Sequence, residues 1–140
     1  MTQAAGVPPP RVTCPTIRVR YAETDRMGVA YYANYLVWFE VGRAEWLRDT
    51  GWTYRAMEDE GLALPVIESH CVYRLGATYD DELEIRTTGR LVSPARLGFD
   101  YEVVRRSDGA VVATGYTVHA TVDRAGRAVR LPARVKELFS

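Results

Sequence analysis

The segment at residues 34–49, NYLVWFEVGRAEWLRD, restricts the possible folds of this chain more than any other. Large apolar side chains recur in it at helical spacing, and further apolar residues fill the neighbouring angles, so the apolar stripe is too wide for a surface helix. A helix of this length extends about 24 Å. Asp49, Thr50 and Gly51 end it in the usual way. Another element must therefore wrap around most of its circumference.

In the rest of the chain, apolar and polar side chains alternate, which predicts a sheet that can wrap around this helix. Residues 16–23 are typical of a half-buried first strand with Ile17, Val19 and Tyr21 on its apolar side. A short helix is predicted over residues 53–61. After it, apolar residues recur at every second position, which predicts four long strands at 64–75, 83–92, 96–105 and 110–122.

Short connections indicate how these strands are arranged. The turns YDD at 79–81, SPA at 93–95 and SDG at 107–109 join consecutive strands so tightly that the strands must be antiparallel. The segment PARVKELF at 132–139 is expected to add one helical turn. This order of elements predicts an α+β hotdog fold, in which a curved five-stranded antiparallel sheet wraps around one long central helix.

The chain is expected to form a single domain over residues 16–140, because 140 residues suffice for one hydrophobic core. Residues 1–15 hold four prolines, few large hydrophobic side chains and no periodic pattern. We therefore expect residues 1–15 to form a disordered or loosely attached arm.

Composition argues against several classes of partner and cofactor. Eighteen Lys and Arg balance eighteen Asp and Glu, so no net positive field exists to hold a nucleic acid. No stretch reaches the ~18 apolar residues of a membrane span and no signal peptide is visible, so no membrane partner and a cytoplasmic location are expected. Cys14, Cys71, His70 and His119 lack metal-ligand spacing, so no metal is expected, and His119 is predicted to be a hydrogen-bonded sheet residue.

The main functional signal is YAETDRMGVAYYANY at residues 21–35. Together with ATYDDELEI at 77–85, it resembles the 4-hydroxybenzoyl-CoA thioesterase family of hotdog enzymes. The core of the resemblance is Asp-x-x-Gly-hydrophobic-x-aromatic-aromatic-x-Asn-Tyr, and the similarity extends from about residue 17 to 132. It implies an acyl-CoA thioesterase that uses no metal or redox cofactor, coenzyme A being part of the substrate.

By this resemblance Asp25 is the catalytic carboxylate, acting either as nucleophile or as general base on a water molecule. The backbone N–H of Tyr32 would polarise the thioester carbonyl, because the start of a helix offers unpaired N–H groups. Gly28 would let the loop turn sharply or approach the ligand closely. Judged from local sequence alone, Asp25 could instead be a loop or capping residue. Glu23 is expected to be solvated, although its charge could affect Asp25.

Four further residues are candidates for substrate binding. Tyr31 would line an acyl pocket. Asn34 would support the loop backbone or the start of the helix, with substrate contact as the alternative. Arg90 and Arg96 flank the SPA turn, where the resemblance places basic residues that contact the phosphates of coenzyme A. Alternatively, Arg90 and Arg96 are solvated residues at the ends of their strands.

The resemblance also implies a homodimer or homotetramer, because family members place active sites between subunits and open sheet edges tend to pair. A hotdog hydratase is disfavoured, since no histidine lies near Asp25 in the sequence. The alternative from another class is a non-catalytic acyl-CoA-binding protein that senses a metabolite. Benzoyl, phenylacetyl and medium-length aliphatic acyl groups all remain open as substrates.

Overall fold

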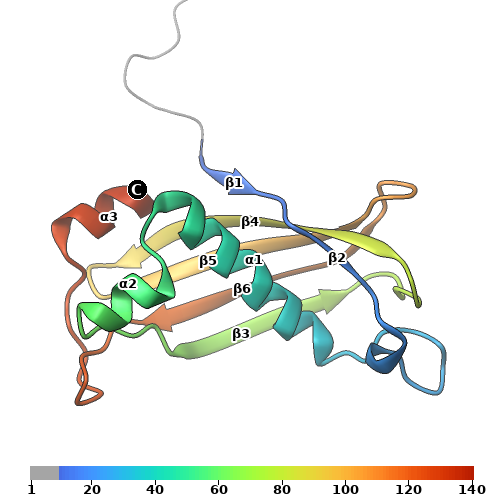
Figure 1. The fold of residues 1–140 in the computed structure, drawn as a ribbon, viewed down its shortest axis with the longest axis horizontal. Coiled ribbons are helices and arrows are strands. Elements are labelled where there is room, and N and C mark those ends of the chain that lie inside the picture. Colours follow the sequence, from blue (N-terminus) through green and yellow to red (C-terminus); the bar gives the residue numbers. More distant parts are fainter. Residues whose placement is uncertain (1–9) are drawn as a thin grey trace, which may run out of the picture.

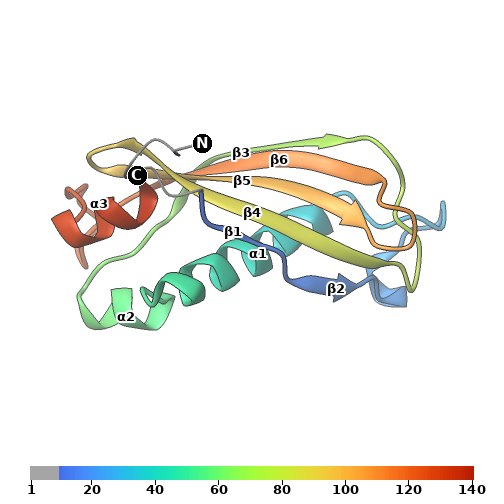
Figure 2. The same cartoon turned by 90° about the horizontal axis from the view of Figure 1, so that it is seen from above.

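A computed structural model describes residues 10–140 of the chain. One antiparallel sheet covers one side of the long helix α1 (Asn34–Thr50), which crosses the sheet diagonally (Figure 1). Seen from above, the sheet and α1 form two layers, with the short helices α2 (Tyr54–Asp59) and α3 (Ala133–Phe139) at one end (Figure 2). The strands are β1 (Val12–Thr13), β2 (Thr16–Arg18), β3 (Val66–Tyr73), β4 (Glu82–Ser93), β5 (Arg96–Arg105) and β6 (Val111–Ala120).

The strand order is β1-β4-β5-β6-β3, and β2 also pairs with β4. β3 and β4 run in opposite directions, as the sequence predicted, but they are not neighbours. β3 pairs with β6 at the far edge, and the connection from residue 74 to 81 crosses the end of the sheet. This connection is not a tight hairpin because β5 and β6 lie between the two strands that it joins. Its backbone pairs with another loop, as Ala30 N–H donates to Ala77 O at 2.8 Å.

The sheet has six strands, one more than predicted, because part of the predicted N-terminal arm pairs with β4. Val12 lies opposite Thr88, and the indole N–H of Trp46 donates to Arg11 O at 2.9 Å. For residues 10–15 the prediction of a loosely attached arm is therefore wrong. The remainder of that arm, residues 1–9, lies outside the described residues.

The predicted first strand ends earlier than the alternation suggested. β2 stops at Arg18, and a 3-10 turn, η1 (Tyr21–Glu23), follows. Val19 is fully buried as expected, but Tyr21 is 78% exposed, so its predicted place on the apolar side is wrong. The N–H of Val19 still donates to Asp81 O at 2.9 Å, which continues the β2–β4 register by one residue, and the chain turns away from the sheet after it.

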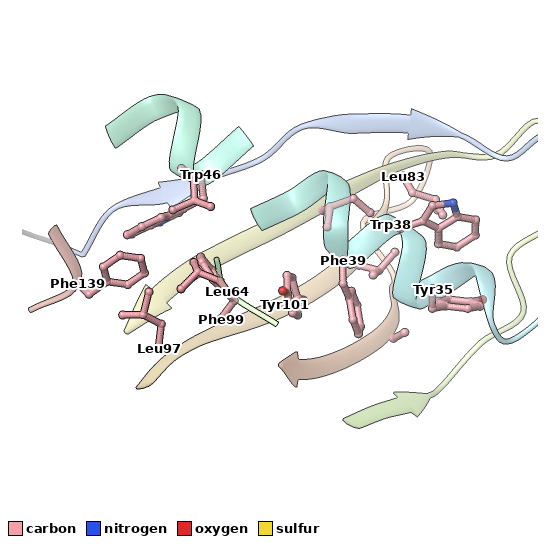
Figure 3. Packing of buried hydrophobic residues seen from close by; sticks show 14 of the residues in the cluster. Tyr35, Trp38, Phe39, Trp46, Leu64, Leu83, Leu97, Phe99, Tyr101 and Phe139 are labelled. Carbon is pink, nitrogen blue, oxygen red and sulfur yellow. The ribbon is translucent and has the colours of Figure 1, made fainter. Parts of the chain in front are cut away.

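Helix α1 packs closely on the sheet because Gly42 faces β4. A Cβ at residue 42 would lie against the Thr87 hydroxyl and 2.8 Å from Cγ2 of Ile85. Beside it, the ring of Phe39 stacks on Tyr101 with centroids 4.2 Å apart (Figure 3). The buried face of α1 comprises Tyr35, Trp38, Phe39, Gly42, Trp46 and Leu47.

The sheet covers less of α1 than the sequence predicted. Leu36 is 41% exposed and Val37 is 53% exposed, although both belong to the broad apolar stripe. A single chain therefore leaves an apolar part of the helix uncovered. Within residues 10–140, no helix is both long enough and apolar enough to cross a membrane.

Candidate active site

The segment that precedes α1 folds into a small hairpin. The N–H of Asp25 donates to Val29 O at 2.9 Å, and the N–H of Tyr31 donates to Glu23 O at 2.8 Å. Gly28 turns the chain with a φ of 82°, in the left-handed region that suits glycine. The hairpin holds Asp25 on one arm and leads from the other arm directly into the start of α1.

The two sequence segments that carry the family resemblance lie against each other. Val29 and Thr78 form an antiparallel bridge, next to the hydrogen bond between Ala30 and Ala77. Asp81 closes its own turn, because its carboxylate accepts the N–H of Thr78 at 2.9 Å. The segment at 77–81 is thus a structural support for the hairpin that carries Asp25.

Asp25 is half-buried and lines a cavity of about 320 Å³. One of its oxygens, Oδ1, accepts the N–H of Met27 at 2.8 Å, which fixes the side chain at the tip of the hairpin. Four tyrosines share the cavity lining, together with a short segment that follows β3: Tyr31, Tyr32, Tyr35, Tyr73 and residues 74–76.

The backbone at the start of α1 leaves donors free beside this cavity. The N–H groups of Tyr32 and Ala33 have no acceptor among residues 10–140. The carbonyl of Tyr32 is held from the other side, because the hydroxyl of Tyr73 donates to it at 2.9 Å. A free N–H at the positive end of a helix attracts an oxygen atom that carries negative charge. Tyr32, whose N–H is free, therefore lines the same cavity as Asp25.

The amide of Asn34 supports the loop backbone, because its Nδ2 donates to Glu23 O at 2.8 Å. Asn34 is not among the residues that line the cavity. The two roles considered for Asn34 were support of the loop backbone and contact with the substrate. The structure shows the hydrogen bond that the supporting role requires.

Glu23 is buried, so the expectation of a solvated side chain is wrong. Only 8% of the residue is exposed. Its Oε1 accepts the N–H of Arg20 at 2.8 Å and its Oε2 accepts the indole N–H of Trp38 at 3.1 Å. Burial alone would raise the pKa of this carboxyl, but the hydrogen bonds from Arg20 and Trp38 outweigh it and lower the pKa.

Within one chain, Arg90 and Arg96 lie far from Asp25. Both flank the SPA turn, level with Val66 at the start of β3, whereas the cavity lies beyond Tyr73 at its other end (Figure 1). β3 alone spans about 23 Å at the usual rise per residue. The Nε of Arg90 donates to Asp100 Oδ2 at 2.9 Å.

Sequence reasoning missed Arg74, which lines the cavity together with Asp25. The only local signal was its place three residues before the ATYDDELEI segment. Nothing in the sequence showed that residue 74 turns toward the hairpin, because this depends on the connection that crosses the end of the sheet.

Comparison with known proteins identifies the family. The profile of the thioesterase-like superfamily matches residues 19–139. The chain belongs to this superfamily. The fold expectation of an α+β hotdog protein and the resemblance drawn from residues 21–35 are thereby confirmed.

Three individual proteins illustrate the similarity. YneP of Bacillus subtilis, named as a candidate acyl-CoA thioesterase, is 45% identical over 71 residues, which is 51% of either chain, so this match spans about half of YneP. The acyl-CoA thioesterase YbgC of Haemophilus influenzae is 35% identical over 92 residues, covering 65% of this chain and 68% of YbgC. The crystal structure of the hypothetical protein AQ1494 from Aquifex aeolicus superposes with a TM-score of 0.84 at 31% identity, covering 94% of this chain and all of AQ1494.

Proposed function

We propose that this protein is an acyl-CoA thioesterase that hydrolyses an acyl-coenzyme A thioester to the free acid and coenzyme A. The observation that carries the proposal is that the half-buried residue Asp25 lines the same cavity as Tyr32, whose N–H is unpaired at the start of a helix. Acyl transfer needs a group that attacks or activates water and a donor for the oxyanion that forms. The names of YneP and YbgC support the same chemistry.

In this mechanism the thioester carbonyl oxygen accepts the N–H of Tyr32. Negative charge develops on that oxygen in the tetrahedral intermediate, and a positioned donor of this kind is worth roughly 3 to 4 kcal/mol in the barrier. The carboxylate of Asp25 either attacks the carbonyl carbon to give a mixed anhydride, which water then hydrolyses, or removes a proton from the attacking water. In both routes the thiolate of coenzyme A leaves and takes up a proton.

The cavity is suited to an aromatic or a short to medium aliphatic acyl group. Its volume of about 320 Å³ lies at the lower end of the usual range for ligand pockets, roughly 300 to 1,000 Å³. The acyl group and the thioester would fill it, and the nucleotide part of coenzyme A would lie outside. Among the described residues that line the cavity Arg74 is the one cation, which makes it our candidate to meet a phosphate or carboxylate of the substrate.

We further propose a homodimer formed through β3, or a tetramer of such dimers. β3 is the last strand in the sheet order, and its side chains are exposed along most of its length. Pairing through this edge would also bring a second apolar surface toward Leu36 and Val37 of α1. Covering these side chains would account for the width of the apolar stripe.

Two-fold pairing of β3 with itself is antiparallel, so the Val66 end of one strand would lie beside the Tyr73 end of the other. Arg90 and Arg96 of the partner subunit would then approach the cavity of this chain. This arrangement supports the phosphate-contacting role that one chain alone does not explain.

The test is a panel of benzoyl-, phenylacetyl- and hexanoyl-CoA with detection of the released thiol, applied to wild type and Asp25→Asn. The amide should still accept the N–H of Met27, and kcat should fall by at least ~100-fold. Asp123→Asn is the matched control, because Asp123 Oδ1 likewise accepts a backbone N–H, that of Ala125, in a turn outside the cavity lining. Unchanged turnover in Asp25→Asn refutes the site, and binding without thiol release across the panel indicates the non-catalytic alternative.

A further inference from the structure

We infer that Glu23 is a positioning residue that sets the place of the oxyanion donor relative to Asp25. The inference rests on the proposed function. Glu23 is not among the residues that line the cavity, so its role would be exerted through other residues. It lies two residues before Asp25 and uses both its main chain and its side chain to tie the hairpin to α1.

The carbonyl oxygen of Glu23 decides which backbone donor faces the cavity. It accepts the N–H of Tyr31 at 2.8 Å and the side-chain amide of Asn34 at 2.8 Å. Since Tyr31 is already paired, the first N–H that remains free along the chain is that of Tyr32. The contact to Asn34 fixes the distance between the hairpin and the first residue of α1.

The carboxylate of Glu23 fixes the same junction from the side of the helix. Trp38, which donates its indole N–H to Oε2, lies one turn into α1 and is 2% exposed. Oε1 accepts the N–H of Arg20 at 2.8 Å, and the Nε of Arg20 lies 3.4 Å from the same oxygen. One side chain therefore connects the segment before the hairpin to the helix that supplies the oxyanion donor.

An ionised acid suits this place better than a neutral residue. Both carboxylate oxygens accept hydrogen bonds from N–H donors, and a glutamine could accept only one of them, because its NH₂ group would face the other donor. Burying a carboxylate is costly unless its hydrogen bonds are made, so the geometry around Glu23 is closely restricted. A shift of about 1 Å at a reacting group can change turnover by two orders of magnitude.

The test compares Glu23→Gln, Trp38→Phe and the double variant in kcat, KM and melting temperature. Each single variant should lower kcat on the order of 10-fold or more, with KM changed less than about twofold. In the double variant the amide oxygen can accept the N–H of Arg20 and no indole donor faces the NH₂ group, so the double variant should lose little more than Trp38→Phe alone. A kcat within twofold of wild type in both single variants overturns the inference, and so does full multiplication of their effects in the double variant.

Glu60→Gln is the matched control for a general loss of stability. Glu60 pairs with Arg134, at the end of the molecule that holds α2 and α3. If Glu60→Gln lowers kcat as much as Glu23→Gln for an equal loss of melting temperature, Glu23 has only a structural role.

A measurement without substrate separates this inference from the proposed function. In protein labelled with ¹⁵N-tyrosine, Glu23→Gln should shift the amide signals of Tyr31 and Tyr32, and Glu60→Gln should not. Absence of thiol release by the wild type would refute the function. Unmoved signals of Tyr31 and Tyr32 would independently refute the role of Glu23.

Discussion

The imidazole of His119 is fully buried, and its titration should make the stability of this protein depend on pH. Nδ1 lies 2.9 Å from Leu64 O, which can only accept, so Nδ1 carries the proton. Nε2 lies 2.9 Å from the Thr117 hydroxyl, which in turn lies 2.7 Å from the Tyr101 hydroxyl. In the neutral imidazole, Nε2 accepts from Thr117 and Thr117 accepts from Tyr101. Protonation of Nε2 would reverse this chain of donors.

The pKa of His119 is lowered to about 4, mainly because burial disfavours the charged ring. The carbonyl of Leu64 opposes the shift and the positive charge of Arg43 adds to it. Between about pH 6.5 and pH 4 the unfolded chain binds this proton and the folded chain does not, so the free energy of unfolding falls as the pH falls. A difference of about 2.5 pKa units corresponds to about 3 kcal/mol.

The assay is urea unfolding, followed by tryptophan fluorescence, of wild type and His119→Asn at pH 7, 6, 5 and 4 and one protein concentration. Asparagine can still donate to Leu64 O but does not titrate. The free energy of unfolding of wild type, minus that of His119→Asn, should fall by about 3 kcal/mol from pH 7 to pH 4. A pH-independent difference for His119→Asn would refute the reasoning.

Two glycine substitutions test the packing of α1 and the hairpin. Gly42→Ala should gain about 1 kcal/mol of helix propensity but lose about 1 to 3 kcal/mol because the new methyl group is overpacked against Ile85 and Thr87. The melting temperature should therefore drop. A rise would contradict the close approach of α1 to β4. Gly28→Ala and Gly126→Ala both place a side chain at a φ near +80° with open space around it, so each should lower the melting temperature by about 4 °C. Only Gly28→Ala should also lower kcat, and equal losses of kcat in both variants would contradict a role for the hairpin.

Much of the fold could be predicted because the spacing of apolar residues along the chain indicates where helices and strands lie. The predicted strand at 96–105 coincides with β5, and the predicted helix at 34–49 differs from α1 by one residue. The cap of α2 was also local, since the N–H of Ala56 donates to the hydroxyl of Thr53 at 3.1 Å. In each case the preference depends on residues within a few positions along the chain.

The expectations that failed depend on contacts between distant residues. Glu23 has the sequence environment of a surface residue, and only the position of Trp38, fifteen residues later, makes it a buried acceptor. Residues 10–15 lack a periodic pattern, and they are ordered because β4 and Trp46 offer partners for their backbone. Such partners cannot be read from alternation or from composition.

The sequence by itself determined the type of fold, the order of its long elements and the segment that carries the family resemblance, because apolar spacing and the residues at 21–35 are local properties. Tertiary structure alone decided that β3 lies beside β6, that Arg74 enters the cavity and that Arg90 and Arg96 stay away from it within one chain. The physical reason is that a strand edge or a cavity wall is formed by surfaces that meet only after the chain has folded, and many pairings satisfy the same local pattern.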